Sequence, residues 1–197
     1  GALDAKAEEV AIFGSASEGF SKANINASIA ESLERFKPVA EMAKEHSIPV
    51  RGYISCVVNC PYDGPTDPAD VATVAKELHA LGCYELSLGD TTGHAYPDEI
   101  TRMLKAVQAD VPDARLAGHY HDTSGRAIEN IEASLAQGIR VFDTSIGGLG
   151  GCPYAPGALG NVATERVDAR LKELGYVTGL DAQILKQAAK KAQALRG

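Results

Sequence analysis

The sequence lacks an apolar run long enough to cross a membrane. No window comes near the roughly eighteen consecutive apolar residues that a transmembrane helix needs, so we expect none. The first residues also lack the basic-then-apolar layout of a secretory signal peptide, and we expect no such targeting segment. With 45% apolar and 23% charged residues, the composition is ordinary for a soluble globular protein. A chain of 197 residues suffices for one sizeable core, which favours a single domain.

Basic residues are too few for a nucleic-acid-binding surface. Lys and Arg total 19 against 26 Asp and Glu, which gives a net charge of −7. We therefore expect no nucleic-acid partner. A phosphorylated ligand is still compatible with this charge, because it needs only a local basic patch or helix N-termini.

The chain also lacks closely spaced cysteine pairs. None of its four cysteines forms a Cys-x-x-Cys motif with another. A chain of this size does not need disulfides for stability, so we expect a reducing compartment. Cys56 and Cys83 adjoin apolar runs and are predicted to pack as small hydrophobic residues. Cys60 lies in a turn region rich in Pro and Gly, and its role stays open at this point.

The sequence does contain a repeated alternation of strand and helix signals. Short apolar runs predict strands at residues 9–13, 50–57, 84–88, 114–120 and 139–144. Helical spacing and end signals predict helices at residues 25–44, 70–80, 97–109, 125–137, 162–174 and 181–195. This alternation is typical of βαβ units around a parallel sheet. The strands read as nearly continuously apolar, which predicts apolar packing on both faces of the sheet.

Glycine and polar residues gather after each predicted strand. That asymmetry is typical of a barrel or a doubly wound sheet with its chemistry at the carboxyl ends of the strands. Five βα units can be counted, whereas a closed (β/α)₈ barrel needs eight and about 250 residues. Either the fold is smaller and open, or roughly three units are missing. Because the chain begins almost directly on a strand, we expect one barrel domain over residues 1–197 that is incomplete at its N-terminal side.

A histidine pair closes the fourth predicted strand, within residues 118–122. Alternate side chains of a strand point to the same face, so His119 and His121 aim together and Tyr120 aims away. Two desolvated imidazoles side by side are unfavourable without a partner. The pair therefore predicts half of a divalent-metal site. The remaining histidines are expected to be structural: His46, His79 and His94.

A glycine-rich run at residues 147–154 places Cys152 among four glycines. A thiol flanked by Gly and Pro, with no apolar run beside it, is predicted to be reactive rather than buried. The alternative is a small residue that fills a tight loop. Read together, the histidine pair and this loop indicate a metal-assisted lyase.

Five segments closely resemble the 3-hydroxy-3-methylglutaryl-CoA lyase family: residues 20–26, 51–56, 83–91, 118–123 and 147–155. The resemblance runs over essentially the whole chain. Its specific part is the Gly-Leu-Gly-Gly-Cys-Pro-Tyr run of residues 148–154. The His-x-His-Asp motif is shared more widely, with the isopropylmalate synthase, homocitrate synthase and aldolase relatives of the same metal-dependent barrel superfamily.

The resemblance implies a (β/α)₈ TIM barrel that holds a divalent cation, Mg²⁺ or Mn²⁺. Its implied ligands are His119, His121, Asn161 and an aspartate that normally stands next to an arginine. No such arginine–aspartate motif precedes residue 9 here, so we expect that these 197 residues alone lack some catalytic groups. Carboxylate, imidazole and amide ligands suit either cation, with two imidazoles leaning toward Mn²⁺.

The implied reaction cleaves 3-hydroxy-3-methylglutaryl-CoA to acetyl-CoA and acetoacetate, as in leucine degradation and ketone-body formation. A cation bound to the C3 hydroxyl lowers its pKa as the carbon–carbon bond breaks. The loop cysteine that protonates the departing enolate corresponds to Cys152, and His119 is assigned a catalytic role with it. Substrate contacts are predicted at Lys22, Asn24, Ser87, Asp90 and Glu165. Asp90 can equally cap the next helix, and Glu165 can support the metal site or the helix dipole.

Two other functions compete with this interpretation. One is a related condensing enzyme or aldolase of the isopropylmalate synthase type, which lacks the Gly-Gly-Cys-Pro-Tyr loop. The other is a non-catalytic fragment of the lyase kept for binding or assembly. The favoured function implies an acyl-CoA substrate and a homo-oligomer, most simply a dimer, with no nucleic acid and no membrane. It also implies a bacterial cytoplasm or a mitochondrial matrix as the location.

Overall fold

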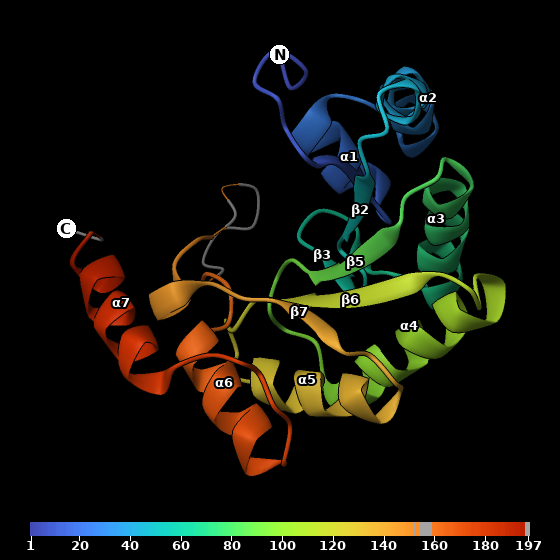
Figure 1. The fold of residues 1–197 in the computed structure, drawn as a ribbon. Coiled ribbons are helices and arrows are strands. Elements are labelled where there is room, and N and C mark those ends of the chain that lie inside the picture. The colour runs from blue at the N-terminus through green and yellow to red at the C-terminus, as the bar shows by residue number, and fades with distance from the viewer. Residues whose placement is uncertain (152, 154–158, 196–197) are drawn as a thin grey trace.

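The computed structural model describes residues 1–151, 153 and 159–195, which form an α/β fold around a parallel sheet (Figure 1). The five strands of this sheet lie in chain order: β1 (Val10–Ser15), β2 (Val50–Ser55), β5 (Glu85–Asp90), β6 (Arg115–Tyr120) and β7 (Val141–Asp143). Every neighbouring pair is parallel. The predicted parallel sheet of five βα units is therefore confirmed.

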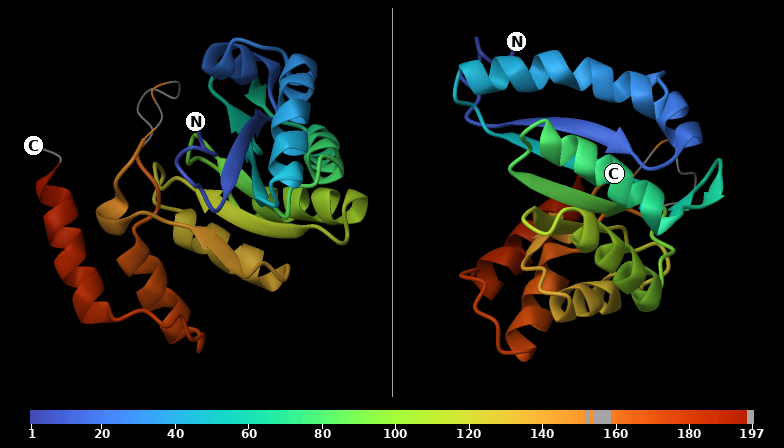
Figure 2. Two further views of the ribbon diagram at one scale, coloured as in Figure 1. Left: turned by 45° about the horizontal axis from the view of Figure 1, so that its top comes forward. Right: turned by 90° about the vertical axis from the view of Figure 1, so that its right-hand side faces the viewer.

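Helices follow the strands, and those of the middle of the chain cover one face of the curved sheet, whereas the last helix lies away from it (Figure 2). They are α1 (Glu18–Ile25), α2 (Ile29–Glu45), α3 (Pro68–Ala80), α4 (Pro97–Asp110), α5 (Ala127–Ala136), α6 (Thr164–Glu173) and α7 (Ala182–Ala194). Local chemistry sets their starts: the carboxylate of Asp67 accepts a hydrogen bond from the Ala69 N–H, and Pro68 opens α3. Among the described residues, no helix has the length and apolar character to span a membrane.

One predicted helix begins later than expected, and a further helix precedes it. The spacing of apolar residues predicted a single helix over residues 25–44, but Asn26 adopts a left-handed φ of 50° and ends α1. Ser28 then begins α2 with a capping box, in which Ser28 and Glu31 satisfy each other's backbone N–H groups. The Ser-x-x-Glu spacing is the sequence signal for this break.

The two faces of the sheet differ chemically, so the prediction of two apolar faces is wrong. The face beneath the helices carries buried aliphatic side chains such as Ile54 and Leu86. Alternate residues place Arg51, Glu85 and Ser87 on the opposite face. These polar residues are nonetheless buried, with exposed fractions of 7%, 4% and 0%. The uncovered face of the sheet is therefore a polar, largely dehydrated surface.

A small hairpin that the sequence did not predict packs against the start of α1. It consists of β3 (Asn59–Cys60) and β4 (Gly64–Pro65). At its turn, the carboxylate of Asp63 accepts hydrogen bonds from the Ser17 hydroxyl and the Gly19 N–H, both at 2.7 Å. The Ser17 hydroxyl also lies 2.8 Å from the buried Cys60 sulfur. The hairpin thus fixes the N-terminus of α1 over the carboxyl end of the sheet.

The three cysteines in the described part of the chain are thiols rather than disulfides. Cys56 and Cys83 are 0% and 4% exposed, as expected for residues that pack as small hydrophobic groups. Burial also raises the pKa of Cys83 to about 11. The fourth, Cys152, lies outside the described residues.

Candidate active site

The two histidines at the end of β6 face the same side of the sheet, as the alternation of side chains predicted. The centres of the His119 and His121 rings are 5.6 Å apart. Tyr120 points the other way and is buried, with its hydroxyl 2.7 Å from Ser134. Directly after β6, the backbone N–H of His121 donates a hydrogen bond to the carbonyl of Asp90 at the end of β5.

Asn161 lies beside His121 although forty residues separate them in the sequence. The two residues form an isolated antiparallel bridge. Each carries a buried polar atom with no hydrogen-bond partner in the described part of the chain: Nδ1 of His121 and the side-chain oxygen Oδ1 of Asn161. Buried polar atoms are normally satisfied, and an unsatisfied pair side by side needs an explanation. Both atoms are electron-pair donors, so together they fit a cation.

The charge state of His121 also suits a ligand. Burial lowers its pKa, the nearby His119 ring lowers it further, and a hydrogen bond to the Thr91 backbone partly opposes them, which leaves the pKa at about 4. His121 is therefore neutral near pH 7, and the neutral imidazole is the form that binds metals.

His119 is held by a carboxylate that the sequence did not single out. Its Nδ1 lies 3.1 Å from Oδ2 of Asp143, the last residue of β7. The register of β6 and β7 places these two residues directly opposite each other. Asp143 also accepts hydrogen bonds from the Ser87 hydroxyl at 2.6 Å and from the Arg51 guanidinium at 3.0 Å.

These contacts keep Asp143 ionised. Burial acts to raise its pKa, but the hydrogen bonds from its three donors and the charge of Arg51 outweigh burial and hold the pKa well below its usual range. The pKa of Arg51 is raised in turn: burial acts to lower it, but the hydrogen bonds and charge of its carboxylate partners prevail. Asp143 and Arg51 were not identified from the sequence as functional residues, because each is a polar residue within a strand and belongs to no catalytic motif.

A pocket of about 330 Å³ opens beside the histidines. It is bounded by residues of the sheet, of α1 and of the glycine-rich segment: Phe13, Phe20, Asn24, Tyr53, Ile54, Ser55, Ser87, Gly89, Thr91, His119, His121, Gly151 and Pro153. Of the predicted substrate contacts, Asn24 and Ser87 therefore lie at the pocket. The hydroxyl of Ser87 is directed to Asp143, which makes it part of the histidine's support.

The other three predicted substrate contacts lie elsewhere. Asp90 is 1% exposed, and its carboxylate accepts hydrogen bonds from the Gly93 and Ala95 N–H groups, so it shapes the loop before α4. Glu165 accepts a hydrogen bond from the Gly147 N–H at 3.1 Å and anchors the glycine-rich segment. Lys22 is exposed on α1 and does not line the pocket.

The base of the glycine-rich segment packs tightly against Asn161. A Cβ on Gly160 would lie 2.4 Å from the Gly150 carbonyl oxygen, and one on Gly150 would lie 2.8 Å from the Asn161 amide nitrogen. The same amide nitrogen donates a hydrogen bond to the Leu149 carbonyl, at 3.4 Å. These contacts fix the amide so that Oδ1 remains available. Cys152, the predicted acid of this segment, is outside the described residues.

The candidate metal donors among the described residues are few. Within residues 1–151, 153 and 159–195, no cluster of three or more His, Cys, Asp or Glu side chains is arranged to hold a metal ion. The described donors are instead two imidazoles and one amide. This set matches three of the four ligands that the family resemblance implied.

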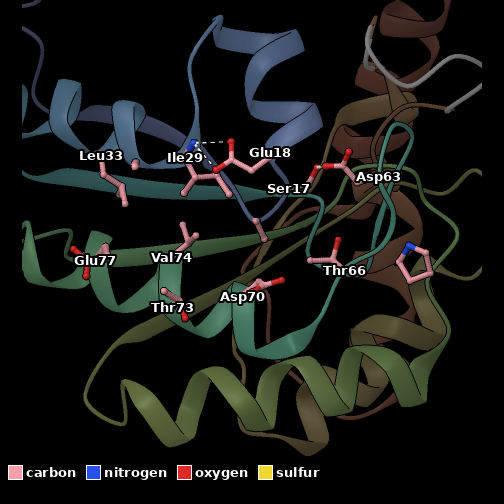
Figure 3. Close-up of a pocket in the computed structure, with 13 residues that line it drawn as sticks. Ser17, Glu18, Ile29, Leu33, Asp63, Thr66, Asp70, Thr73, Val74 and Glu77 are labelled. Carbon is pink, nitrogen blue, oxygen red and sulfur yellow. Dashed lines mark hydrogen bonds between the residues drawn. The ribbon is translucent and has the colours of Figure 1, made fainter.

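A second pocket, of about 620 Å³, lies between α3 and the start of α2 (Figure 3). Acidic side chains border it, among them Glu18, Asp70 and Glu77. Of the predicted site residues in the described part of the chain, none lines it. The candidate active site is therefore the smaller pocket at the histidines.

Comparisons with known proteins agree on one family. The family model described as HMGL-like matches residues 1–191. A Pseudomonas aeruginosa protein named 3-hydroxy-3-isohexenylglutaryl-CoA/hydroxy-methylglutaryl-CoA lyase is 55% identical over 196 residues, which are 100% of this chain and 65% of that protein. A Gallus gallus protein named mitochondrial hydroxymethylglutaryl-CoA lyase is 54% identical over 184 residues, 93% of this chain and 62% of its own.

The structural comparison gives the same result. The crystal structure of the HMG-CoA lyase from Brucella melitensis superimposes with a TM-score of 0.95 and 58% identity, and the match covers 99% of this chain and 69% of that one. The chain thus spans just under two thirds of the length of the two curated relatives. On the match of the family model and on this fold, the chain belongs to the HMGL-like family.

Proposed function

We propose that the protein takes part in cleaving 3-hydroxy-3-methylglutaryl-CoA to acetyl-CoA and acetoacetate, as a lyase that depends on a divalent cation. The observation that carries this proposal is the pair of buried, unpartnered donor atoms on His121 and Asn161, next to the ring of His119. The names of the relatives support the substrate. They do not favour a condensing enzyme of the isopropylmalate synthase type.

His119, His121 and Asn161 would hold the cation, Mg²⁺ or Mn²⁺, together with the aspartate that the family resemblance implies. A divalent cation in such a site lowers the pKa of a substrate hydroxyl and fixes its position. The HMGL-like family is generally metal-dependent, and the choice between the two ions is part of the proposal. The neutral state of His121 leaves a ring nitrogen lone pair for this purpose.

The chain's own residues then prepare the pocket. Phe13 stacks on Tyr53 with ring centres 4.5 Å apart, and Phe20 borders the same pocket, so the pocket offers apolar ring surface to a ligand. Asn24 offers an amide for a polar group of the acyl-CoA. Cys152 is proposed as the acid that gives its thiol proton to the departing enolate carbon.

Four further assignments belong to the same proposal. Residues 1–197 form part of a single catalytic barrel domain, which one continuous sheet and one main core cluster support. The protein acts as a homo-oligomer, with a dimer as the simplest form, and has neither a nucleic-acid nor a membrane partner. It works in a bacterial cytoplasm or a mitochondrial matrix, in line with one bacterial relative and one named mitochondrial.

The proposal is tested by an assay on the full-length protein stripped of metal by a chelator. Stripped protein should produce no acetoacetate from 3-hydroxy-3-methylglutaryl-CoA, and adding Mg²⁺ or Mn²⁺ should restore production. Condensation of acetyl-CoA with a 2-oxo acid, measured in parallel, should remain at background. Condensation without cleavage would identify a synthase instead, and neither reaction under any metal would contradict the catalytic assignment.

A further inference from the structure

We propose that Asp143 is a positioning residue that sets the orientation and the tautomer of His119. This inference rests on the proposed function, because it takes His119 as a ligand of the cation. It adds a residue that the resemblance to the lyase family did not supply.

The contact between the two side chains defines the tautomer. Asp143 Oδ2 lies 3.1 Å from His119 Nδ1. An ionised carboxylate can only accept hydrogen bonds, so Nδ1 must carry the ring hydrogen. The lone pair of the neutral ring is then on Nε2, the atom directed away from Asp143. A carboxylate in this position both aims the imidazole and makes it a better donor to a metal.

Asp143 is itself fixed by a two-pronged ion pair. Nη1 of Arg51 lies 3.0 Å from Oδ2 and Nη2 lies 2.9 Å from Oδ1, so the guanidinium contacts both carboxylate oxygens of Asp143. Paired hydrogen bonds of this kind fix the plane of the carboxylate as well as its position. The Ser87 hydroxyl adds a third contact, at 2.6 Å. The carboxylate therefore has little freedom to turn away from the imidazole.

Arg51 is anchored in its turn. Its Nε donates to Oε1 of Glu85 at 2.8 Å, and its Nη1 also contacts the Tyr53 hydroxyl. The side chains of Arg51 and Glu85 are 9% and 5% exposed, so this part of the network is almost dry. Arg51 therefore bridges two carboxylates on the polar face of the sheet, of which Asp143 contacts His119 and Glu85 does not.

Glu85 provides a matched control, because it belongs to the same buried network without touching His119. Replacing Glu85 by Gln should strain the network and lower the thermal stability of the protein, yet leave Asp143 beside the imidazole. Replacing Asp143 by Asn is nearly isosteric but removes the obligate acceptor. The amide has one oxygen in place of the two that now accept from His119, Ser87 and Arg51. It carries no charge to hold the hydrogen on Nδ1, and with its NH2 group turned to the ring it favours the tautomer with the hydrogen on Nε2, where no lone pair is left for a cation.

The test is a titration of Mn²⁺ into metal-free full-length protein, followed by electron paramagnetic resonance of the free ion. Asp143→Asn should weaken Mn²⁺ binding by about 10- to 100-fold, the usual effect of losing such support. Pulsed measurements on the bound ion should show a weakened coupling to imidazole nitrogen. Glu85→Gln should keep the affinity and the nitrogen coupling of the unmodified protein.

Each outcome separates this inference from the proposed function. Unchanged Mn²⁺ affinity in a folded Asp143→Asn protein would overturn the positioning role and leave the metal site intact. Equal losses in Asp143→Asn and Glu85→Gln would also overturn it, because the effect would then come from the network as a whole. If the unmodified protein binds no Mn²⁺, both the proposed function and this inference fail.

Discussion

His121 and Asn161 face each other in an isolated antiparallel bridge, and each carries one buried donor atom without a hydrogen-bond partner among the described residues. Leaving such atoms unsatisfied typically costs about 1–3 kcal/mol each, so the arrangement is unfavourable unless something binds there. The bridge joins the end of β6 to the segment before α6, and both segments are rigidly held by neighbouring backbone contacts.

We predict that His119→Ala, His121→Ala and Asn161→Ala each weaken Mn²⁺ binding and reduce turnover, because each removes a ligand. Isothermal titration calorimetry on the full-length protein measures the affinity. His46→Ala, which changes an exposed histidine at the C-terminal end of α2, is the matched control and should bind Mn²⁺ normally. Normal binding by any of the three site variants would remove that residue from the ligand set.

Cys152→Ser should separate chemistry from metal binding. A serine hydroxyl is a far weaker acid than a thiol, and general-acid transfer contributes roughly 10²–10⁴ in rate. Turnover should fall by about that factor, whereas the Mn²⁺ affinity should stay near that of the unmodified protein. Steady-state kinetics beside calorimetry measure both quantities. Turnover at the original rate would reduce the thiol to a packing role.

Gly160→Ala should disturb the base of the glycine-rich segment. The new Cβ would meet the carbonyl oxygens of Gly150 and Gly148 at 2.4 and 2.7 Å, so the backbone must move. Overpacking of this kind costs about 1–3 kcal/mol, and urea unfolding should show a loss of that size. Gly14→Ala is the control, because its Cβ meets no described atom closer than 3.5 Å. Equal stability of the two variants would contradict the packing described here.

Asp63→Ala should lower the free energy of unfolding by about 1 kcal/mol at pH 7, the usual size of a lost helix-capping contact. Hydrogen bonds from the Ser17 side chain and the Gly19 backbone hold the pKa of Asp63 below its ordinary value of 3.8. The contact of the ionised carboxylate therefore stabilises the folded protein at higher pH, and this contribution to the free energy of unfolding is lost as the pH falls below that value. The difference between the two proteins should be full above pH 4 and shrink under more acidic conditions.

Urea unfolding at a series of pH values measures this difference. Asp113→Ala, which changes an exposed carboxylate in the turn before β6, serves as the control. It should leave the free energy of unfolding almost unchanged across the pH series. A destabilisation of Asp63→Ala that does not change with pH would contradict the ionic contact between the hairpin and α1.

The part of the site that the sequence could predict is the part fixed by local periodicity. His119 and His121 are two positions apart in a strand, so their shared direction follows from the pleat alone. The helix break at Asn26 was missed, although the Ser-x-x-Glu spacing that begins at Ser28 is a local signal for it. Asn161 was reached only through the resemblance to a family, because its place beside His121 depends on how a distant loop returns to the sheet.

The network of polar contacts that supports His119 could not be predicted from the sequence, for a different reason. Arg51 lies near the start of β2, three strands away from β7 in the sheet, yet its long side chain crosses the polar face of the sheet to Asp143. Such a contact depends on strand order, register and the curvature of the sheet together. The contact between the Ser87 hydroxyl and Asp143 could not be predicted for the same reason, and from the sequence Ser87 was assigned only a contact with substrate.

The most direct test of the account is to locate the metal. Crystals of the full-length protein soaked in Mn²⁺ should give an anomalous difference peak within coordination distance of a ring nitrogen of His119, a ring nitrogen of His121 and the side-chain oxygen of Asn161. The same peak should vanish from crystals of Asn161→Ala and His121→Ala soaked alike. A Mn²⁺ peak that avoids these three side chains, or no peak at a concentration that restores turnover, would contradict the central claim.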